Sequence, residues 1–370
     1  MNKALSFIGV MSGSSLDGID VALTEITDDY CKIVATHFQA YSAEIKQSLL
    51  ALHFPSENEL EKSALMANQL ASLYAQAINS LLSNNQLSSK DVTAVGCHGQ
   101  TIRHQPRLND TVGYTVQLGN HALLAELTNI TVVGDFRSRD IAAGGQGAPL
   151  VPAFHKDVFA HPDKNRAIVN IGGIANITYL ARNGDVFGFD SGPGNLLLDH
   201  WVKNSLGQEY DADGAWAATG VINQPLLSHM LADSYFALPP PKSTGRDHFN
   251  QAWLTRHIAQ LDCQPQDIAH TLVALTSQTI DEAIHQYCPE VDEVYLCGGG
   301  AHNRLLRDSI AASLNPIALS TTDQLGINVD WVEAGAFAWL ARQTMHNKTS
   351  NLPAATGAHG SRVLGAIYPA

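Results

Sequence analysis

The chain has 370 residues, of which 45% are hydrophobic and 15% are charged, and its formal net charge is -13 at pH 7. This length exceeds what one hydrophobic core usually fills, so we expect two domains with a cleft between them. The negative balance disfavours nucleic acid, whose phosphates are bound by clustered Lys and Arg. No apolar run is long enough to predict a membrane segment, and residues 1–11 carry no cleavage signal. We therefore expect a cytoplasmic protein.

The cysteines favour neither a disulfide framework nor a zinc site. Their number is odd and no C-x-x-C pair occurs among Cys31, Cys97, Cys263, Cys288 and Cys297. We expect them to be small buried hydrophobic residues.

The first half of the chain alternates strand and helix patterns. Residues 7–23, FIGVMSGSSLDGIDVAL, predict a strand, a turn rich in glycine and hydroxyls, and a second strand. Residues 42–87 place leucines three and four apart, which predicts helices on a core. Residues 91–101 and 129–152 run from β-branched residues into glycine and polar groups. They predict parallel strands that end in functional loops.

The second half repeats this order. Residues 166–195 predict a strand, a glycine turn, two further strands and a Gly-Pro-Gly loop, so the chain looks duplicated. A third glycine turn, at 294–303, follows an apolar strand and precedes a helix. Residues 331–345 predict another helix, whereas the Pro-rich stretch 237–250 is either a lid or a packing loop.

Glycine turns that follow strands are typical of phosphate-binding sites. Glycine lets phosphate oxygens approach the backbone N–H groups, and serine hydroxyls add donors. Asp17 would repel a phosphate unless a divalent cation lay between them, which favours Mg²⁺ bound partly through water. No Walker A motif occurs. One such turn alone is equally compatible with a structural hairpin, but three in matching positions favour a nucleotide.

Motifs along nearly the whole chain carry a family resemblance. They are GVMSGSSLDGID, GCHGQTIRH, VQLGNHALLAELT, VVGDFRSRDIAAGGQGAPLVPAFH, VNIGGIANIT, GFDSGPGN, DADGAWAATG, PKSTGRDHFN, CGGGAHN, WVEAGAFAWLA and TGAHGSRVLGAIYP. With these motifs the chain resembles the actin-like ATPase superfamily and, within it, the anhydro-N-acetylmuramic acid kinases. The family usually has Thr where Ser14 stands, so the hydroxyl is kept.

The resemblance implies an α/β fold of two duplicated actin-like, ribonuclease H-like domains that flank a nucleotide cleft. Residues 1–138 and about 345–370 would form the first domain, mainly the sugar side. Residues 139–344 would form the second, with the adenosine-binding loop. It also implies a homodimer.

The implied reaction uses ATP and Mg²⁺. The enzyme hydrolyses the 1,6-anhydro bond of 1,6-anhydro-N-acetylmuramic acid and phosphorylates O6, which gives N-acetylmuramic acid 6-phosphate in peptidoglycan recycling. The implied ATP-binding residues are Gly13, Ser14, Ser15, Leu16, Asp17, Gly18, Ile19, Asp20, Asn170, Gly172, Gly173, Gly298, Gly299, Gly300 and Asn303.

Asp190 matches the catalytic base of the family. It ends a strand and enters the Gly-Pro-Gly loop, so its carboxylate is placed to take a proton from the water that attacks the anomeric carbon. The alternative is a turn carboxylate that caps its own loop.

Sugar recognition is assigned to polar residues near predicted strand ends, namely His98, Gln100, Thr101, Asp135, Arg137 and Gln146. Arg137 offers a planar fork of donors for the lactyl carboxylate of the sugar. Equally, Arg137 and Arg139 are placed to pair with Asp135 and Asp140. Glu333 stands among apolar residues, which favours a role in orienting the sugar over simple solvent exposure.

Two rival functions remain open at this point. An actin-like or chaperone-type ATPase shares the nucleotide motifs but needs a polymer surface or a peptide-binding domain. A glycoside hydrolase that uses Asp190 and Glu333 as a carboxylate pair would open the sugar without ATP, and it leaves the three glycine turns unexplained.

Overall fold

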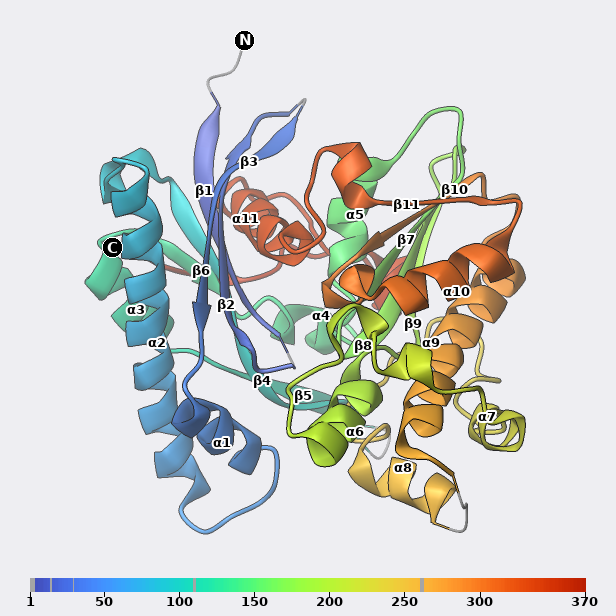
Figure 1. Cartoon of the computed structure of the whole chain (residues 1–370). Helices are drawn as coiled ribbons and strands as arrows, with labels where there is room; N and C mark the ends of the chain where they lie inside the picture. Colours follow the sequence, from blue (N-terminus) through green and yellow to red (C-terminus); the bar gives the residue numbers. More distant parts are fainter. Residues whose placement is uncertain (1–3, 14, 29, 109–110, 260–262) are drawn as a thin grey trace. The chain divides into compact units, whose positions relative to one another are not determined.

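The computed structural model describes residues 4–13, 15–28, 30–108, 111–259 and 263–370, and it divides into two compact units (Figure 1). The first unit comprises the chain up to Val158 together with Trp331–Ala370, and the second comprises Phe159–Asp330. No helix in the described ranges has both the length and the apolar character needed to cross a membrane.

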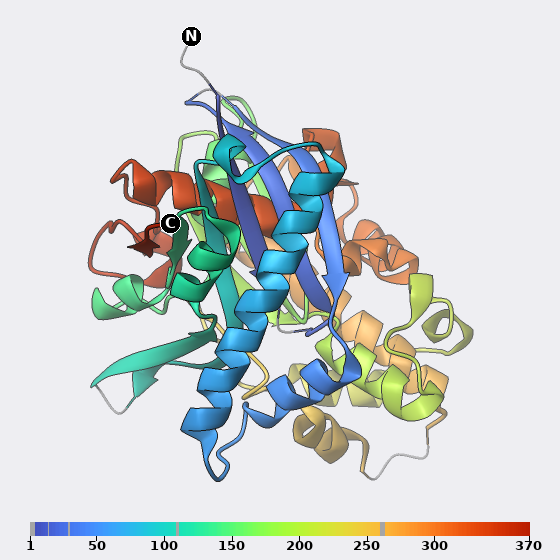
Figure 2. The same ribbon diagram turned by 90° about the vertical axis from the view of Figure 1, so that its left-hand side faces the viewer.

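The first unit is built on one mixed sheet with the strand order β12-β6-β4-β1-β2-β3, and β5 pairs with β4. Its strands are β1 (Leu5–Ser12), β2 (Gly18–Ile26), β3 (Cys31–Ala40), β4 (Ala94–Leu108), β5 (Thr111–Leu118), β6 (Val132–Gly134) and β12 (Ala366–Tyr368). Its helices are α1 (Ala43–Ala51), α2 (Glu59–Asn84), α3 (His121–Thr128), α4 (Ser138–Ala142), α5 (Val151–Phe159), α11 (Val332–Met345) and α12 (Pro353–Thr356). Helices α2 and α3 cover one face of the sheet and α11 covers the other (Figures 1 and 2).

The second unit has a five-stranded sheet with the order β11-β10-β7-β8-β9. Its strands are β7 (Arg166–Ile171), β8 (Ile174–Leu180), β9 (Val186–Pro193), β10 (Glu293–Cys297) and β11 (Ala318–Thr321). Its helices are α6 (Leu196–Leu206), α7 (Gln224–Leu231), α8 (Gln251–Ile258), α9 (Pro265–Tyr287) and α10 (Arg304–Leu314). Helix α9 packs against β8 and β9, and α10 packs against α9.

The two sheets share one topology. In each, the first three strands form an antiparallel meander, and the first strand also pairs in parallel with a later strand, β4 or β10. A fifth strand, β6 or β11, adds to that later strand in parallel. The predicted α/β class and the duplication are therefore confirmed, and this order is the one expected of ribonuclease H-like domains.

Helix α11 lies unusually close to the sheet of the first unit. A Cβ atom added to Gly9 of β1 would lie 1.7 Å from the main-chain oxygen of Ala334. A Cβ added to Gly96 of β4 would lie 2.0 Å from that of Phe337. Since Gly9 and Gly96 are neighbours in the parallel register, they form one flat patch that admits the helix.

The units divide at other residues than the predicted boundaries of 138 and 344. Helix α11 belongs to the first unit because it packs on β1, β2 and β4. The segment after residue 138 belongs there too, because the buried carboxylate of Asp140 accepts hydrogen bonds from Asn351 and Thr356, both at 2.8 Å. Trp339 of α11 also donates to Asp157 of α5 at 2.7 Å.

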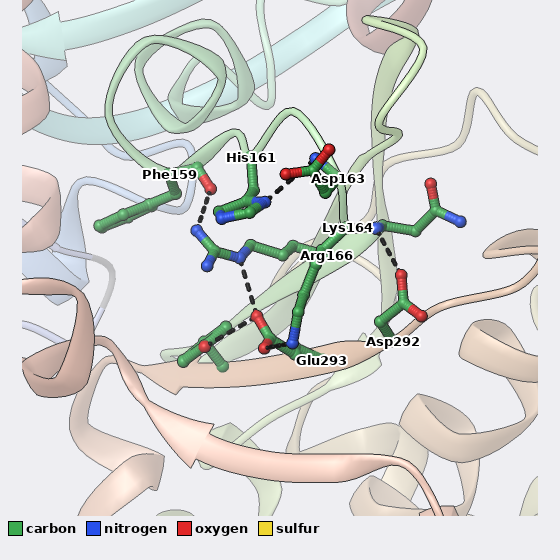
Figure 3. Close-up of polar contacts among 9 residues, drawn as sticks. Phe159, His161, Asp163, Lys164, Arg166, Asp292 and Glu293 are labelled. Atoms are coloured by element: carbon green, nitrogen blue, oxygen red, sulfur yellow. Dashed lines mark hydrogen bonds and ion pairs between the residues drawn. The ribbon is translucent and has the colours of Figure 1, made fainter.

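An ion cluster joins the starts of β7 and β10 in the second unit (Figure 3). Glu293 pairs with Lys164 and with Arg166, the latter at 3.0 Å, and it accepts a hydrogen bond from Tyr295. Burial alone would raise the pKa of Glu293, but the hydrogen bonds from Lys164, Arg166 and Tyr295 together lower it to about 2. Arg166 and Glu293 are the first residues of their strands, so this cluster lies at the opposite strand ends from Asn170 and Cys297.

The cysteines are all free thiols. Cys97, Cys288 and Cys297 are buried as predicted, whereas Cys31 and Cys263 are half-buried. Within the described ranges no group of three or more His, Cys, Asp or Glu side chains is arranged to hold a metal ion.

Candidate functional site

The first glycine turn joins β1 to β2. Leu16 has a positive φ of 62°, which is an outlier for a branched residue, and its N–H donates to the oxygen of Gly13 at 3.2 Å. The side chains of Leu16 and Ile19 are buried in the core, so these two residues offer a ligand only their backbone. Ser15 and Asp17 are exposed, and Ser14 lies outside the described residues. The turn thus presents a hydroxyl and a carboxylate to solvent.

A buried network of hydrogen bonds joins this turn to β4 and α2. Ser12 Oγ donates to the oxygen of Gly99 at 3.2 Å and shares a hydrogen bond of 2.9 Å with the hydroxyl of Tyr74. Gln100, which is fully buried, donates to the oxygen of Gly13 at 3.1 Å. Burial raises the pKa of Tyr74 well above its usual value, so its hydroxyl stays protonated. Gly99 and Gln100, in the middle of β4, therefore fix the shape of the turn.

His98 and Arg137 form a second polar group in the first unit. The guanidinium of Arg137 donates to His98 Nε2 from Nη2 at 2.9 Å and from Nε at 3.1 Å. Its Nη1 donates to the oxygen of Gly147 at 2.6 Å. Burial, and then the charge of Arg137, hold the pKa of His98 well below its usual range. The imidazole is therefore neutral and acts as an acceptor that orients Arg137.

Asp135 and Asp140, the two carboxylates of the alternative network with Arg137 and Arg139, both accept hydrogen bonds from backbone N–H groups. The carboxylate of Asp140 binds the N–H of Gly147 as well as Asn351 and Thr356, so it ties loops together. Asp135 has a φ of 54° and accepts a hydrogen bond from the N–H of Ser138 at 3.3 Å, at the start of α4.

The other predicted sugar-binding residues also lie in the first unit. Thr101 accepts a hydrogen bond from Gln117 at 3.1 Å, and the buried Gln146 donates its N–H to the oxygen of Thr356 at 2.8 Å. Glu333 is half-buried in the first turn of α11.

Asp190 in the second unit belongs to a polar row that crosses the sheet. Cys297 of β10 is in register with Asn170 of β7, Asn170 with Asn176 of β8, and Asn176 with Asp190 of β9. Directly opposite residues share a face of a sheet, so these four side chains lie on the same face. Asn170 Oδ1 is 3.8 Å from the sulfur of Cys297. The row brings two predicted site residues, Asn170 and Asp190, onto one surface.

A β-bulge lies beside Asp190. Ala175 pairs with Gly192 and Asn176 pairs with Asp190, so Ser191 has no opposite residue. Such bulges re-aim neighbouring side chains and are common next to active sites. Asp190 itself is only 9% exposed.

The glycine turns of the second unit lie at the carboxyl ends of β7, β9 and β10 and contact one another. Gly194, Asn195 and Leu196 donate their N–H groups to the oxygens of Gly172 and Gly173 at 2.8–3.1 Å. A Cβ added to Gly298, whose φ is +78°, would lie 2.4 Å from Asn170 Oδ1. The glycine at 298 therefore permits the close approach of the two segments.

Asn303 has a structural role at the end of the third glycine turn. Its Oδ1 accepts the N–H of Leu306 at 3.0 Å and so caps α10. An added Cβ at Gly214 would lie 2.3 Å from the same oxygen.

Comparison with known proteins decides the family. A family model described as anhydro-N-acetylmuramic acid kinase matches residues 5–370. The chain is 52% identical over 364 residues to an anhydro-N-acetylmuramic acid kinase of Nitrosomonas europaea, which covers 98% of this chain and 99% of the relative. It is 51% identical over 372 residues to that of Thiobacillus denitrificans, covering 100% and 98%.

The chain belongs to the anhydro-N-acetylmuramic acid kinase family.

Among solved structures, an activator of the 2-hydroxyisocaproyl-CoA dehydratase from Clostridium difficile with bound ADPNP aligns with a TM-score of 0.47. It has 12% identity and covers 90% of this chain and 93% of that one. A ROK family glucokinase from Streptomyces griseus aligns with a TM-score of 0.40 and 13% identity over 91% of this chain and 99% of that one.

For this anhydro-N-acetylmuramic acid kinase family member, sequence reasoning missed two features beside Asp190. One is Asn176, whose Oδ1 is buried without a hydrogen-bond partner among the described residues. Strand periodicity in NITYLA gives its face, because 176 is a polar position between apolar ones. The other is the contact of segment 235–244 with Asp190: the sequence marks 237–250 as a lid or packing loop, but it does not indicate that Tyr235, Lys242 and Thr244 bind Asp190.

Proposed function

We propose that this chain uses ATP to phosphorylate O6 of 1,6-anhydro-N-acetylmuramic acid while water opens the anhydro bridge. The products are N-acetylmuramic acid 6-phosphate and ADP, as peptidoglycan recycling requires. The main support is the polar row that places Asp190 and Asn170 on one face of the sheet. Beside this row, the glycine segments at 172–173, 194 and 298 contact their neighbours closely.

Asp190 acts as the general base. It takes a proton from a water molecule whose oxygen forms a bond to C1 of the sugar. The C1–O6 bond breaks, and O6 forms a bond to the γ-phosphorus of ATP as the bond between that phosphorus and the ADP oxygen breaks. Alignment and charge neutralisation supply most of the acceleration of such a phosphoryl transfer.

Residues of both units bind ATP in this proposal. Backbone N–H groups of the two glycine hairpins contact the phosphates, and the third glycine segment contacts the adenosine. The residues are Gly13, Ser14, Ser15, Leu16, Asp17, Gly18, Ile19, Asp20, Asn170, Gly172, Gly173, Gly298, Gly299, Gly300 and Asn303.

The donor chemistry of the first turn fits Mg²⁺. Asp17 is an exposed carboxylate two residues after the exposed Ser15, and Mg²⁺ is usually held by one or two carboxylates, water and substrate phosphates. Asp17 would hold the ion through water. When bound, the ion neutralises charge on the phosphates.

Sugar recognition falls to the first unit. Arg137, held in place by His98 and Gly147, pairs with the lactyl carboxylate, and Glu333 orients the sugar. The remaining contacts come from Gln100, Thr101, Asp135 and Gln146. We also propose that the protein works as a cytoplasmic homodimer.

Mass spectrometry of the product made in oxygen-18 water tests this function. We expect ADP release that requires the anhydro sugar, label in the anomeric hydroxyl and phosphate on O6. Equal ATP turnover with and without sugar would instead support an actin-like or chaperone-type ATPase. Opening of the sugar in the absence of ATP would support a glycoside hydrolase.

A further inference from the structure

Asp190 lies on the outer strand of its sheet, and its backbone groups face the free edge. Strand β9 is the last in the order β11-β10-β7-β8-β9. The N–H of Asp190 donates to the oxygen of Lys242 at 3.1 Å, and its own oxygen accepts the hydroxyl of Tyr235 at 2.8 Å. In an antiparallel strand the N–H and C=O of one residue point to the same side. Residues 235–244, here called the brace, therefore occupy the edge at this position.

The brace also holds the carboxylate. The N–H of Thr244 donates to Asp190 Oδ2 at 2.9 Å. One segment thus fixes the main-chain nitrogen, the main-chain oxygen and a side-chain oxygen of the same residue. A carboxylate that accepts a backbone N–H is held in both place and direction.

Two buried polar side chains hold the brace together. Lys242 is 7% exposed, and its Nζ donates to the oxygens of Tyr235 and Phe236 at 3.4 and 3.3 Å. The same nitrogen lies 4.8 Å from the centre of the Tyr235 ring. Burial lowers the pKa of Lys242, and the charge of Asp190 opposes that change. Burying the ammonium group of Lys242 costs free energy, and an apolar side chain at this position would not incur that cost.

Tyr235 remains a hydrogen-bond donor under all working conditions. Burial, and then the negative charge of Asp190, raise the pKa of its hydroxyl. Its ring packs edge-on against Phe236 and Phe249. These two contacts hold the ring of Tyr235 and so fix the place of its hydroxyl.

We propose that Tyr235 is a positioning residue for the general base and that the brace sets the direction of the Asp190 carboxylate. This inference rests on the proposed function in one respect, the role of Asp190. In this proposal the Pro-rich stretch 237–250, which the sequence predicts to be a lid or a packing loop, helps to orient the general base.

Tyr235→Phe tests the brace, with Tyr179→Phe as the matched control. Tyr179 lies in the same unit and donates its hydroxyl to the oxygen of Pro289 at 2.6 Å. Each variant loses one bond from hydroxyl to carbonyl, so we expect similar decreases in melting temperature. For Tyr235→Phe alone we expect kcat to fall about tenfold, the rate equivalent of one hydrogen bond, with both KM values within about twofold of wild type.

A double-mutant cycle with Asp190→Asn separates the two proposals. We expect Tyr235→Phe to cause no further loss of kcat in the Asp190→Asn background. A normal kcat for Tyr235→Phe, or losses that multiply, would overturn the brace while leaving the base assigned. Near-normal turnover of Asp190→Asn alone would overturn the proposed role of Asp190.

Lys242→Met provides a second variant should Tyr235→Phe not fold. It keeps the aliphatic stem and removes the ammonium that binds the carbonyls of Tyr235 and Phe236. We expect a lower kcat with unchanged KM values, against a wild-type kcat for Lys164→Met in the distant ion cluster. An unchanged kcat for Lys242→Met would contradict the proposal.

Discussion

Asn176 and Asp190 lie directly opposite each other on antiparallel strands, in the register that begins with Leu180 and Val186, and the β-bulge at Ser191 follows this pair. An amide and a carboxylate therefore share one face of the sheet, next to Asn170. The bulge shifts only the pairs that follow, in which Ala175 opposes Gly192 and Ile174 opposes Pro193.

Asp190→Asn is expected to lower turnover by roughly 10² to 10⁴, because the amide cannot accept the proton of the attacking water. ATP binding should persist, as measured by isothermal titration calorimetry. Asp185→Asn, on the exposed turn between β8 and β9, is the control and should retain wild-type turnover. A fully active Asp190→Asn enzyme would remove this residue from the mechanism.

Asn176→Ala should separate catalysis from stability. The side-chain oxygen of Asn176 has no hydrogen-bond partner within the described chain, so its removal breaks no bond there and should cost under about 1 kcal/mol. If the polar row contacts the reactants, kcat should fall about tenfold or more. Steady-state kinetics and urea unfolding measure the two effects. A variant that is destabilised but fully active would place Asn176 outside the site.

Buried histidines should make the protein less stable in mild acid. Burial lowers the pKa of His155 to about 3 and, together with the charge of Arg137, that of His104 to about 4. Both take up protons near pH 6.5 only when unfolded, so the unfolded state binds more protons below that pH. Stability should therefore decline as pH falls below about 6.5, by up to about 1.4 kcal/mol per pH unit for each histidine.

Urea unfolding at pH 7.5, 6.5 and 5.5 measures this decline. His155→Phe should flatten the dependence, whereas His229→Gln, at an exposed position, should keep the wild-type slope. An equal slope for His155→Phe and wild type would show that this imidazole contributes nothing to the effect.

The ion cluster should stabilise the protein at neutral pH and lose its effect in acid. Because the pKa of Glu293 is lowered to about 2, the contribution is complete above the usual glutamate pKa of 4.5 and disappears as pH falls towards 2. Glu293→Gln should lower the free energy of unfolding by about 1–3 kcal/mol at pH 7. The difference from wild type should shrink below pH 4.5.

Glu290→Gln is the matched control, because Glu290 pairs with Arg182 at the surface and its side chain is 77% exposed. It should change the unfolding free energy by under about 0.5 kcal/mol. A difference between Glu293→Gln and wild type that stays constant from pH 7 to pH 3 would contradict the assigned role of the charge.

Sequence reasoning found the strands, the glycine turns and the duplication because alternation and glycine spacing are local signals. It did not find the partners of Asp190. Those partners are the main-chain oxygen of Lys242, which accepts the N–H of Asp190, and the N–H of Thr244, which donates to its carboxylate, and neither contact has a signature in residue type. The domain boundaries differed because the place of α11 depends on Gly9 and Gly96, which are far from it in sequence.

The division of the chain at Val158 and Trp331 has a consequence for biosynthesis. A ribosome completes every residue of the second unit before it reaches α11, which closes one face of the first sheet, and β12, which pairs with β6. The central part of the gene product can thus mature while translation continues. The amino-terminal strands keep Gly9 and Gly96 uncovered until α11 has been synthesised.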